Sequence, residues 1–488
     1  GGTREVREAR FRNNVVIHQD PVPGKKAGFH VDSDFGIDLQ NVGPGRMKLF
    51  AHGETRPVTI ASEDVFIQGF PDPKADGKVV VGVDQSHDYA FIQGPGRLWS
   101  MADRSSMGRL ELASDRQEES PDQGKEPLIV TWNEAMFFHG QFAEPDGSPG
   151  PARALFLGDV KSRNGDAGSA CQEMEAVFDR PVSFDRALPG QAGGEGRSED
   201  RELEIASIIC HGQVELWSLV RDEENPVGVR ELRQATGESL TFDRVADQFW
   251  MDSAGSVSVA TLEDGRSRLR MPGQGVIPTA YQNEMGQGEA ARRPASRPRL
   301  VKIKIEFNDG LEGQLGTAGG GYRVAEFRGD ARAIRASVAQ FQDPLDFDRP
   351  PSDAVLLEGD TIYVEHNPAV PGVPERNFLK AFGSAQARSD GKTLLGDTIT
   401  YDTNTGNFFV KGSATAPVTI ASQETFGQPT SRTTARALRF NTNTEESELL
   451  DPGSGIFFRP QTGIRLGLGG VERTPAKPER PRPKPRLP

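Results

Sequence analysis

The sequence predicts an all-β protein that uses one strand-and-turn module several times. Three separated segments place Gly and an acidic neighbour before an alternating strand that ends on a carboxylate: Gly237–Asp243, Gly359–Glu365 and Gly396–Asp402. The 488 residues include 55 Gly and 35 Pro, and apolar residues do not recur at helical spacing. Repetition of one strand module builds an extended β surface rather than a single catalytic pocket, so these observations favour a binding or scaffolding role.

The composition excludes some functions and constrains others. A net charge of −13 argues against a nucleic-acid-binding protein. The 27 Phe far outnumber the 5 Tyr and 4 Trp, and a Phe ring has no polar group, so these rings need a core or an apolar groove. No run of 18 apolar residues is present, so the sequence predicts no membrane-spanning helix.

The strand patterns fall into three blocks that we expect to be β domains, at 1–115, 127–285 and 300–465. The acidic stretch 115–126 and the Gly/Ala/Arg/Pro-rich stretch 286–299 separate them. Within the last block, the segment from Val301 to Phe307 alternates strictly between apolar and charged residues, which is typical of a half-buried strand.

Residues 466–488 form a tail in which Pro and basic residues alternate. From Glu472 onward the tail carries six basic residues against two acids. Such a composition predicts a disordered, solvated spacer, or alternatively an anchor for acidic lipid or cell-wall polymer.

Short motifs in the chain resemble the OstA-like lipopolysaccharide-transport family, which comprises periplasmic bridge proteins and the N-terminal domain of their outer-membrane partner. The family alternates a strand of the form A-x-F-x-G-N-V-x-V with one of the form L-x-A-D-x-I-x-Y-D. Ala154–Val160, Ala325–Ala331 and Phe11–Val16 match the first form, with Asp159 in place of Asn and Asn13 in place of Gly. The modules that begin at Gly359 and Gly396, and more loosely the one at Gly237, match the second form.

The resemblance implies a folded-over β-sheet stack of the β-taco or β-jellyroll type, with an apolar groove for acyl chains. The candidate groove residues are Phe11, Val15, Ile17, Phe156, Phe242, Trp250, Ile303, Ile305, Phe307, Ile362, Ile399, Tyr401 and Phe409. The residue pattern alone leaves a second possibility open, in which the same side chains pack on one another as a closed core. The resemblance also implies that open sheet edges pair with other OstA-like transport proteins.

The chain shows no recognisable catalytic or metal-binding motif. It has neither a Gly-x-Ser-x-Gly elbow nor a His-Glu-x-x-His pair, and we expect no enzyme activity, no cofactor and no metal site. The two cysteines, Cys171 and Cys210, are either one disulfide or two separate buried thiols.

These observations lead to one expected function and two alternatives. The resemblance implies a periplasmic protein that binds lipopolysaccharide or a similar amphiphile and helps to carry it from the inner to the outer membrane. The alternatives are a structural β-repeat protein of the cell envelope without a lipid ligand, and a carbohydrate-processing β-helix enzyme, for which no cluster of acids is found. The sequence starts at Gly1 and shows no secretory signal, so a signal or anchor segment is expected upstream of it.

Overall fold

A computed structural model gives the arrangement of most of the chain. It describes residues 7–19, 29–43, 46–62, 65–74, 76–102, 126–143, 148–183, 203–221, 228–263, 299–314, 323–367, 376–389, 392–402, 407–413, 417–422, 431–441 and 447–452. The predicted tail at 466–488 lies outside these ranges, as do almost all residues of the predicted linkers 115–126 and 286–299.

Every regular element in the described ranges is a β-strand, which confirms the predicted fold class. The strands of the N-terminal part are short and comprise β1 (Glu8–Arg12), β2 (Val15–Gln19), β3 (Phe29–Ser33), β4 (Gly36–Gly43), β5 (Arg46–Gly53), β6 (Val58–Ala61), β7 (Val65–Gly69), β8 (Val79–Asp84), β9 (Tyr89–Gln93), β10 (Gly96–Ala102), β11 (Glu126–Trp132), β12 (Ala135–His139), β13 (Phe142–Ala143) and β14 (Pro149–Gly150). The middle part has longer strands, namely β15 (Arg153–Asn164), β16 (Ala167–Phe178), β17 (Ile205–Arg221), β18 (Val229–Asp243), β19 (Gln248–Met251), β20 (Gly255–Glu263), β21 (Arg299–Phe307) and β22 (Gly310–Gln314). The last part contains β23 (Arg323–Ser337), β24 (Val355–Asn367), β25 (Arg376–Ser389), β26 (Lys392–Asp402), β27 (Asn407–Lys411), β28 (Val418–Ser422), β29 (Ser431–Asn441) and β30 (Ser447–Pro452).

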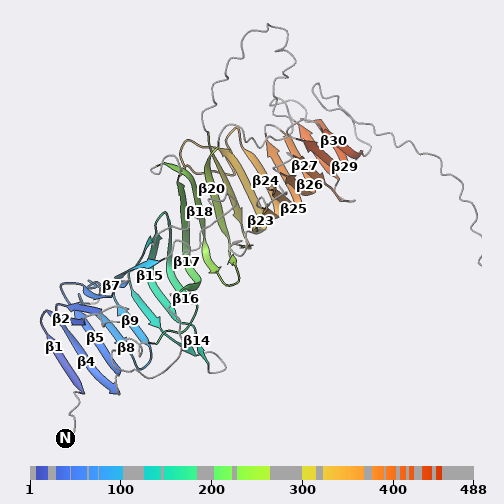
Figure 1. Cartoon of the computed structure of the whole chain (residues 1–488). Helices are drawn as coiled ribbons and strands as arrows, with labels where there is room; N and C mark the ends of the chain where they lie inside the picture. The colour runs from blue at the N-terminus through green and yellow to red at the C-terminus, as the bar shows by residue number, and fades with distance from the viewer. Residues whose placement is uncertain are drawn as a thin grey trace, which may run out of the picture.

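Apart from the small β13–β14 pair, the strands form one antiparallel sheet of 28 strands that is folded over along its length. We call its two halves the β1 arm and the β2 arm. In the β1 arm the pairing runs β1–β4–β5–β8–β9–β12–β15, and in the β2 arm it runs β2–β3–β6–β7–β10–β11–β15. From β15 onward, several long strands belong to both arms. Figure 1 shows the result, an elongated stack that runs from β1 at one end to β30 at the other.

Each long strand passes from one arm to the other at a corner, and alternate strands make that corner with two consecutive left-handed residues. These pairs are Gly158–Asp159 (φ 83° and 44°), Gly212–Gln213 (75° and 49°), Gly329–Asp330 (81° and 47°) and Gly383–Ser384 (72° and 47°). Asn13–Asn14 (65° and 53°) joins β1 to β2 in the same way. Left-handed backbone costs L-residues about 1–2 kcal/mol each, which is why Gly, Asn and Asp are frequent at these positions.

The three Gly modules of the sequence lie on the intervening strands. We expected each Gly pair to form a turn before its strand, but β24 begins at Val355 and β26 at Lys392, so Gly359 and Gly396 lie within continuous strands at the corner. A Cβ at Gly359 would stand 2.8 Å from the carbonyl oxygen of Phe382, and one at Gly396 would stand 2.8 Å from Cγ1 of Val410. The glycines are therefore required by close approach of neighbouring strands rather than by a turn.

The sheet continues across both predicted linkers. Strand β10 pairs with β11 from Gly96–Trp132 to Ala102–Glu126, and β20 pairs with β21 from Gly255–Phe307 to Glu263–Arg299. The three expected blocks are thus joined by the same backbone hydrogen bonds that hold each block together.

A segment between β23 and β24 covers part of the outer face. Leu345 and Ala354 from this segment form a small second core with Ile334 and Ala336 of β23. Below it, Lys302 is 5% exposed, because its Nζ donates hydrogen bonds to the carbonyl oxygens of Phe341 (3.1 Å) and Asp343 (2.9 Å). Burial lowers the pKa of Lys302.

Asp34 holds the connection between β5 and β6 near its corner. Its carboxylate accepts hydrogen bonds from the backbone N–H groups of Glu54 (3.1 Å), Thr55 (2.8 Å) and Arg56 (2.9 Å) and from the Thr55 hydroxyl. Burial opposes ionisation of this carboxyl, but the four hydrogen bonds outweigh it and lower the pKa of Asp34 to about 2.

The steric role of the corner glycines can be measured with two Gly→Ala substitutions. Gly329 and Gly77 both have left-handed φ angles, but a Cβ at Gly329 would stand 2.6 Å from the backbone nitrogen of Asp309, whereas one at Gly77 meets nothing within 4 Å. We expect Gly77→Ala to cost about 1 kcal/mol from conformational strain and Gly329→Ala to cost clearly more, as measured by urea unfolding. Equal losses would show that the corner tolerates a side chain.

Asp34→Asn should remove a pH-dependent part of the stability. Because the folded pKa of Asp34 is depressed, its stabilising effect is present above about pH 4 and is lost as the pH falls toward 2. The wild-type urea midpoint should therefore fall more steeply than that of the variant between about pH 4 and pH 2. Parallel pH profiles for the two proteins would contradict this assignment.

Candidate functional site: the inner face of the folded sheet

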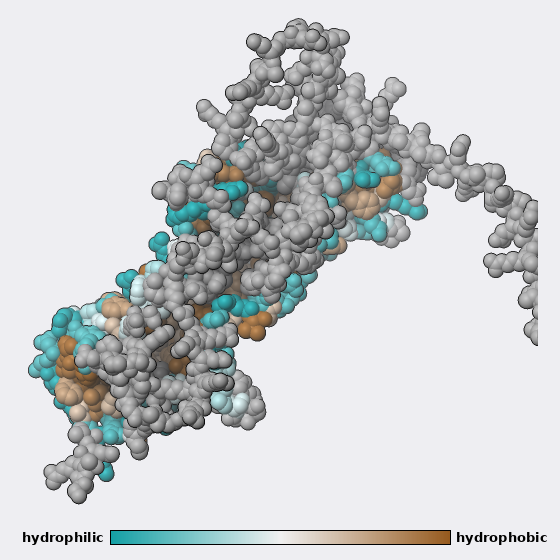
Figure 2. Space-filling model, in the orientation of Figure 1, coloured by the Kyte–Doolittle hydropathy of each residue, from teal (hydrophilic) through white to brown (hydrophobic). Residues whose placement is uncertain are grey.

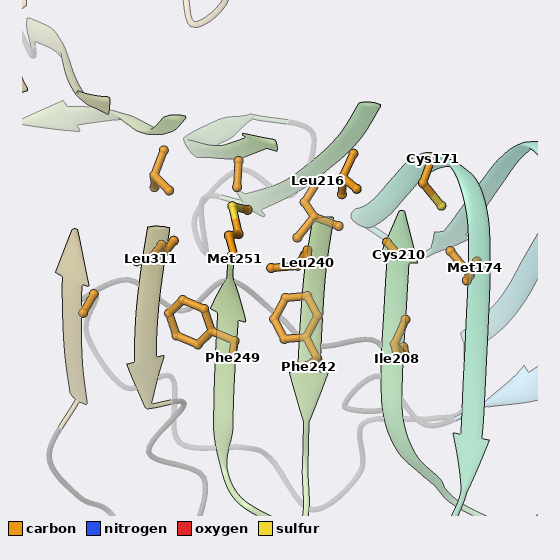
Figure 3. Packing of buried hydrophobic residues seen from close by; sticks show 14 of the residues in the cluster. Cys171, Met174, Ile208, Cys210, Leu216, Leu240, Phe242, Phe249, Met251 and Leu311 are labelled. Atoms are coloured by element: carbon orange, nitrogen blue, oxygen red, sulfur yellow. The ribbon is translucent and has the colours of Figure 1, made fainter. Parts of the chain in front are cut away.

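The interior between the two arms is one continuous apolar layer. The buried cluster includes Val15 of β2, Trp132 of β11, Phe249 of β19 and Leu438 of β29, so it extends along almost the whole stack. Figure 3 shows part of it, where Leu240, Phe242, Phe249 and Met251 project from neighbouring strands into the same space. Since successive strands continue the same inner face, the chain builds a long apolar trough rather than several separate cores.

Exposure of the inner side chains increases with distance from the corners. Next to the corner, Ile37 and Val58 are 0% exposed. Two residues further along the same strands, Leu39 and Ile60 are only partly buried. We call this part of the inner face, which lies farther from the corners, the mouth row. Its clearest members are Ile17, Ile60, Ile67 and Leu98 on the β2 arm and Leu39, Leu49, Phe138 and Phe178 on the β1 arm.

Most of the predicted groove residues lie in the deeper layer. Those that are nine-tenths buried or more are Val15, Phe156, Phe242, Ile305, Phe307, Ile362, Ile399 and Tyr401. Ile17 and Ile303 are partly buried and pack against them at the mouth. In this structure the chain's own side chains therefore fill the space along the corners, and the apolar surface that remains accessible is the mouth row.

Two predicted groove residues face outward, which corrects the sequence interpretation. Trp250 lies between Phe249 and Met251, and Phe409 lies between Phe408 and Val410. These four flanking residues belong to the inner core. Because alternate residues of a strand point to opposite faces, Trp250 and Phe409 project from the outer face, and Phe409 is 39% exposed.

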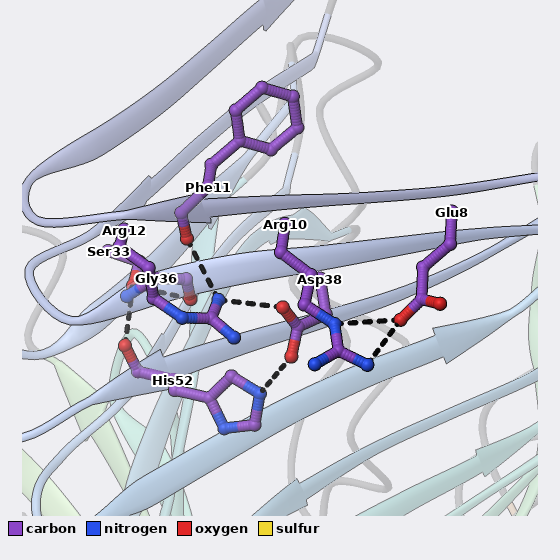
Figure 4. Close-up of polar contacts among 8 residues, drawn as sticks. All are labelled: Glu8, Arg10, Phe11, Arg12, Ser33, Gly36, Asp38 and His52. Atoms are coloured by element: carbon purple, nitrogen blue, oxygen red, sulfur yellow. Dashed lines mark hydrogen bonds and ion pairs between the residues drawn. The ribbon is translucent and has the colours of Figure 1, made fainter. Parts of the chain in front are cut away.

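At the N-terminal end of the described ranges, the inner face of the sheet is partly exposed. Phe11 pairs with the fully buried Ile37 on the same inner face, yet Phe11 is 44% exposed because β1 is the last strand of its arm in the described ranges. Figure 4 shows the Phe11 ring directed away from the polar network of the outer face, and Figure 2 shows hydrophobic surface at this end of the molecule. The end of the trough is thus accessible.

The outer face at this end is polar and charged. Arg12 Nη1 lies 2.6 Å from Oδ1 of Asp38, whose other oxygen faces His52 Nε2 at 3.5 Å. The hydrogen bond from Arg12 lowers the pKa of Asp38. The contrast between this face and Phe11 shows that the sheet is amphipathic up to its terminal strand.

One ion pair is buried on the inner face. Arg233 (3% exposed) and Glu231 (8% exposed) lie on the same side of β18 as the core residue Ala235, and Arg233 Nε donates a hydrogen bond to Glu231 Oε1. Such a pair stabilises little by itself, but removal of one partner leaves a buried charge without its counter-ion and costs several kcal/mol.

The two cysteines are free thiols that lie side by side. Cys171 of β16 and Cys210 of β17 are 3% and 1% exposed, and each thiol affects the pKa of the other. Of the two possibilities left open by the sequence, the structure thus shows two buried thiols, although they are adjacent rather than separate.

The described ranges show no metal-binding cluster and no membrane-spanning helix. These ranges hold no group of three or more His, Cys, Asp or Glu side chains that could bind a metal ion. No helix that is long and apolar enough to cross a membrane occurs in the same part of the chain. No protein-family model, no curated protein and no solved structure matches the chain.

The sequence interpretation missed most of the mouth row. Alternation identifies which residues face inward, but it does not give their distance from a corner. The usable signal is the distance of an inward residue from its corner, such as Phe138 beyond Met136, and Phe178 beyond both Met174 and Ala176.

Substitutions at Ile399 and Tyr401 can establish whether the deep layer is structural. These residues are 1% and 4% exposed, so Ile399→Asp and Tyr401→Asp would each bury a charge at a cost of several kcal/mol. We expect both variants to lose the cooperative unfolding transition followed by circular dichroism. Thr400→Asp, on the outer face beside Lys380, is the matched control and should fold. Folded Asp variants at 399 and 401 would show that this layer has room for water or ligand.

Proposed function

We propose that this chain binds lipopolysaccharide or a similar amphiphile along the trough between its arms, and helps to carry it between the inner and outer membranes. The observation that carries the proposal is the mouth row, a band of partly exposed apolar residues on both arms of one uninterrupted interior. The role is binding and transfer, without catalysis, and its location is the periplasm or cell envelope.

The geometry suits a ligand with several acyl chains. Removal of one methylene from water contributes about 0.8 kcal/mol, so a few chains laid on the mouth row would bind firmly without a charged contact. The layer beside the corners is already filled, so the ligand would lie on the mouth row, and the arms would part to admit it. Each described long strand crosses between the arms at its corner, and the corners lie on the side opposite the mouth.

The motif resemblance supports the same proposal. The residues that resemble the OstA-like family are those that form the corners, since Gly158–Asp159, Gly329–Asp330 and Asn13–Asn14 are the Gly-Asn positions of that motif. The shared pattern therefore has a structural cause, which is the left-handed pair that folds the sheet over.

The ends of the sheet suit partners that add a strand. Among the described strands, β1 pairs only with β4, β2 only with β3, and β30 only with β29. Such edges present free backbone groups to another β protein, and in this proposal the partners are other OstA-like transport proteins.

A second candidate is a structural β-repeat protein of the cell envelope that binds no lipid. The filled deep layer favours it, because Ile37, Val58, Phe327 and Ile362 are fully buried by the protein itself. The same open edges would then serve assembly.

A displacement assay distinguishes the two candidates. The protein at micromolar concentration should enhance the emission of a dansyl-labelled fatty acid, and purified lipid A should reverse the enhancement. Ile60→Asp in the mouth row, opposite Ile67 and Val31, should weaken probe binding at least tenfold.

Thr59→Asp is the matched control, since Thr59 is the outward-facing neighbour of Ile60 on β6. It should bind the probe like the wild type, and both variants should keep the wild-type circular dichroism spectrum. If the wild type gives no enhancement, or if both variants bind equally well, the lipid-binding proposal fails and the structural one is favoured.

A further inference from the structure

The two cysteines lie on the adjacent strands β16 and β17, one on each side of the corner that these strands share. Val160 of β15 pairs with Cys171 of β16, just after the left-handed pair Gly158–Asp159. Met174 of β16 pairs with Cys210 of β17, and Cys210 stands two residues before the left-handed pair Gly212–Gln213. Figure 3 shows Cys171 where β16 curves over, and Cys210 on the neighbouring strand β17.

The repeat shows what normally stands at the position of Cys171. Ala331 of β23 pairs with Gly359 of β24 in the same way as Val160 pairs with Cys171. Val214 of β17 likewise pairs with Gly237 of β18. These corner positions thus carry Gly in the related strands, and Cys171 is the one that carries a side chain. Its Cβ and Sγ must therefore fit into the narrow space beside the neighbouring strand.

The β24–β25 pair provides a measure of that space. Gly359 is followed two residues later by Thr361, which pairs with Phe382. Cys171 is followed by Glu173, which pairs with His211. Ala381 therefore corresponds to Cys210, and a Cβ built at Gly359 stands 3.4 Å from Cβ of Ala381. Disulfides join Cβ atoms that are about 3.5–4.5 Å apart, so this position in the fold is suited to one.

We propose that Cys171 and Cys210 are an oxidation site, at which a small-molecule disulfide converts the two thiols into a bond that ties β16 to β17 across the corner. One thiolate attacks the oxidant, releases one thiol and forms a mixed disulfide. The second cysteine then loses its proton, attacks the first sulfur and releases the second thiol, so that one oxidant disulfide is reduced for each bond formed.

The two thiols affect each other's protonation. The interaction between them lowers the pKa of Cys171, and the same interaction together with burial raises the pKa of Cys210. Since both side chains are buried in the folded chain, the bond forms while the strands assemble or when the corner opens.

Refolding of the full chain provides the test. Protein diluted from urea into oxidised glutathione should lose both thiols in a thiol count under denaturing conditions and remain monomeric on a non-reducing gel. Peptide mapping should find one cross-link between Cys171 and Cys210 that dithiothreitol cleaves. The urea midpoint of the oxidised protein should exceed that of the reduced protein, because the bond restricts the unfolded chain.

Single substitutions make the result specific. Cys210→Ser should leave Cys171 carrying one glutathione, and neither Cys210→Ser nor Cys171→Ser should show the oxidation-dependent shift of the urea midpoint. Retention of both thiols in the wild type, separate glutathione adducts on the two cysteines, or cross-linked dimers would overturn the proposal. None of these readouts depends on lipid binding.

Discussion

The consecutive left-handed residues at the corners are the constraint on which the rest of this structure depends. An antiparallel sheet of this length would otherwise be flat or twisted, with one apolar face exposed to water over its whole area. The pair Gly329–Asp330, and its equivalents at 158, 212 and 383, turns its own strand back, and the intervening strands follow at the same corner, so that the sheet covers its own apolar face. Because the corners recur at the same place on successive strands, the two arms remain aligned from one end to the other.

The sequence predicted this arrangement well where local chemistry decides the outcome. In β26 the alternation of Ile399 and Tyr401 with Thr398 and Thr400 correctly separated the inner from the outer face, since a strand has a period of two. The strand motif identifies the corners at 158 and 329, but it does not identify those at Gly212–Gln213 and Gly383–Ser384. Gln and Ser replace the usual Asn or Asp there, and a Gly makes the first left-handed step possible without either.

Other features depend on contacts that lie far apart in the sequence. Phe249–Trp250 and Phe408–Phe409 are adjacent aromatic pairs, so alternation alone does not say which ring is inside, and the pairing with neighbouring strands decides. The alternation of β21 places Lys302 on the outer face, where a lysine is normally solvated. It is buried because the segment before β24 lies over it and supplies two backbone carbonyl groups as hydrogen-bond acceptors.

The order of the strands has a consequence for how this protein reaches its folded state. After β15, nearly every strand pairs with the strand that precedes it in the chain, and even in the short-stranded region the partners are close in sequence. Local pairing of this kind keeps the entropy cost of loop closure small and makes neighbouring rungs the unit of cooperativity. In a chain delivered progressively from its N-terminus, each new strand would therefore find its pairing partner already folded. Assembly would proceed by sequential addition of strands to the edge of the growing sheet.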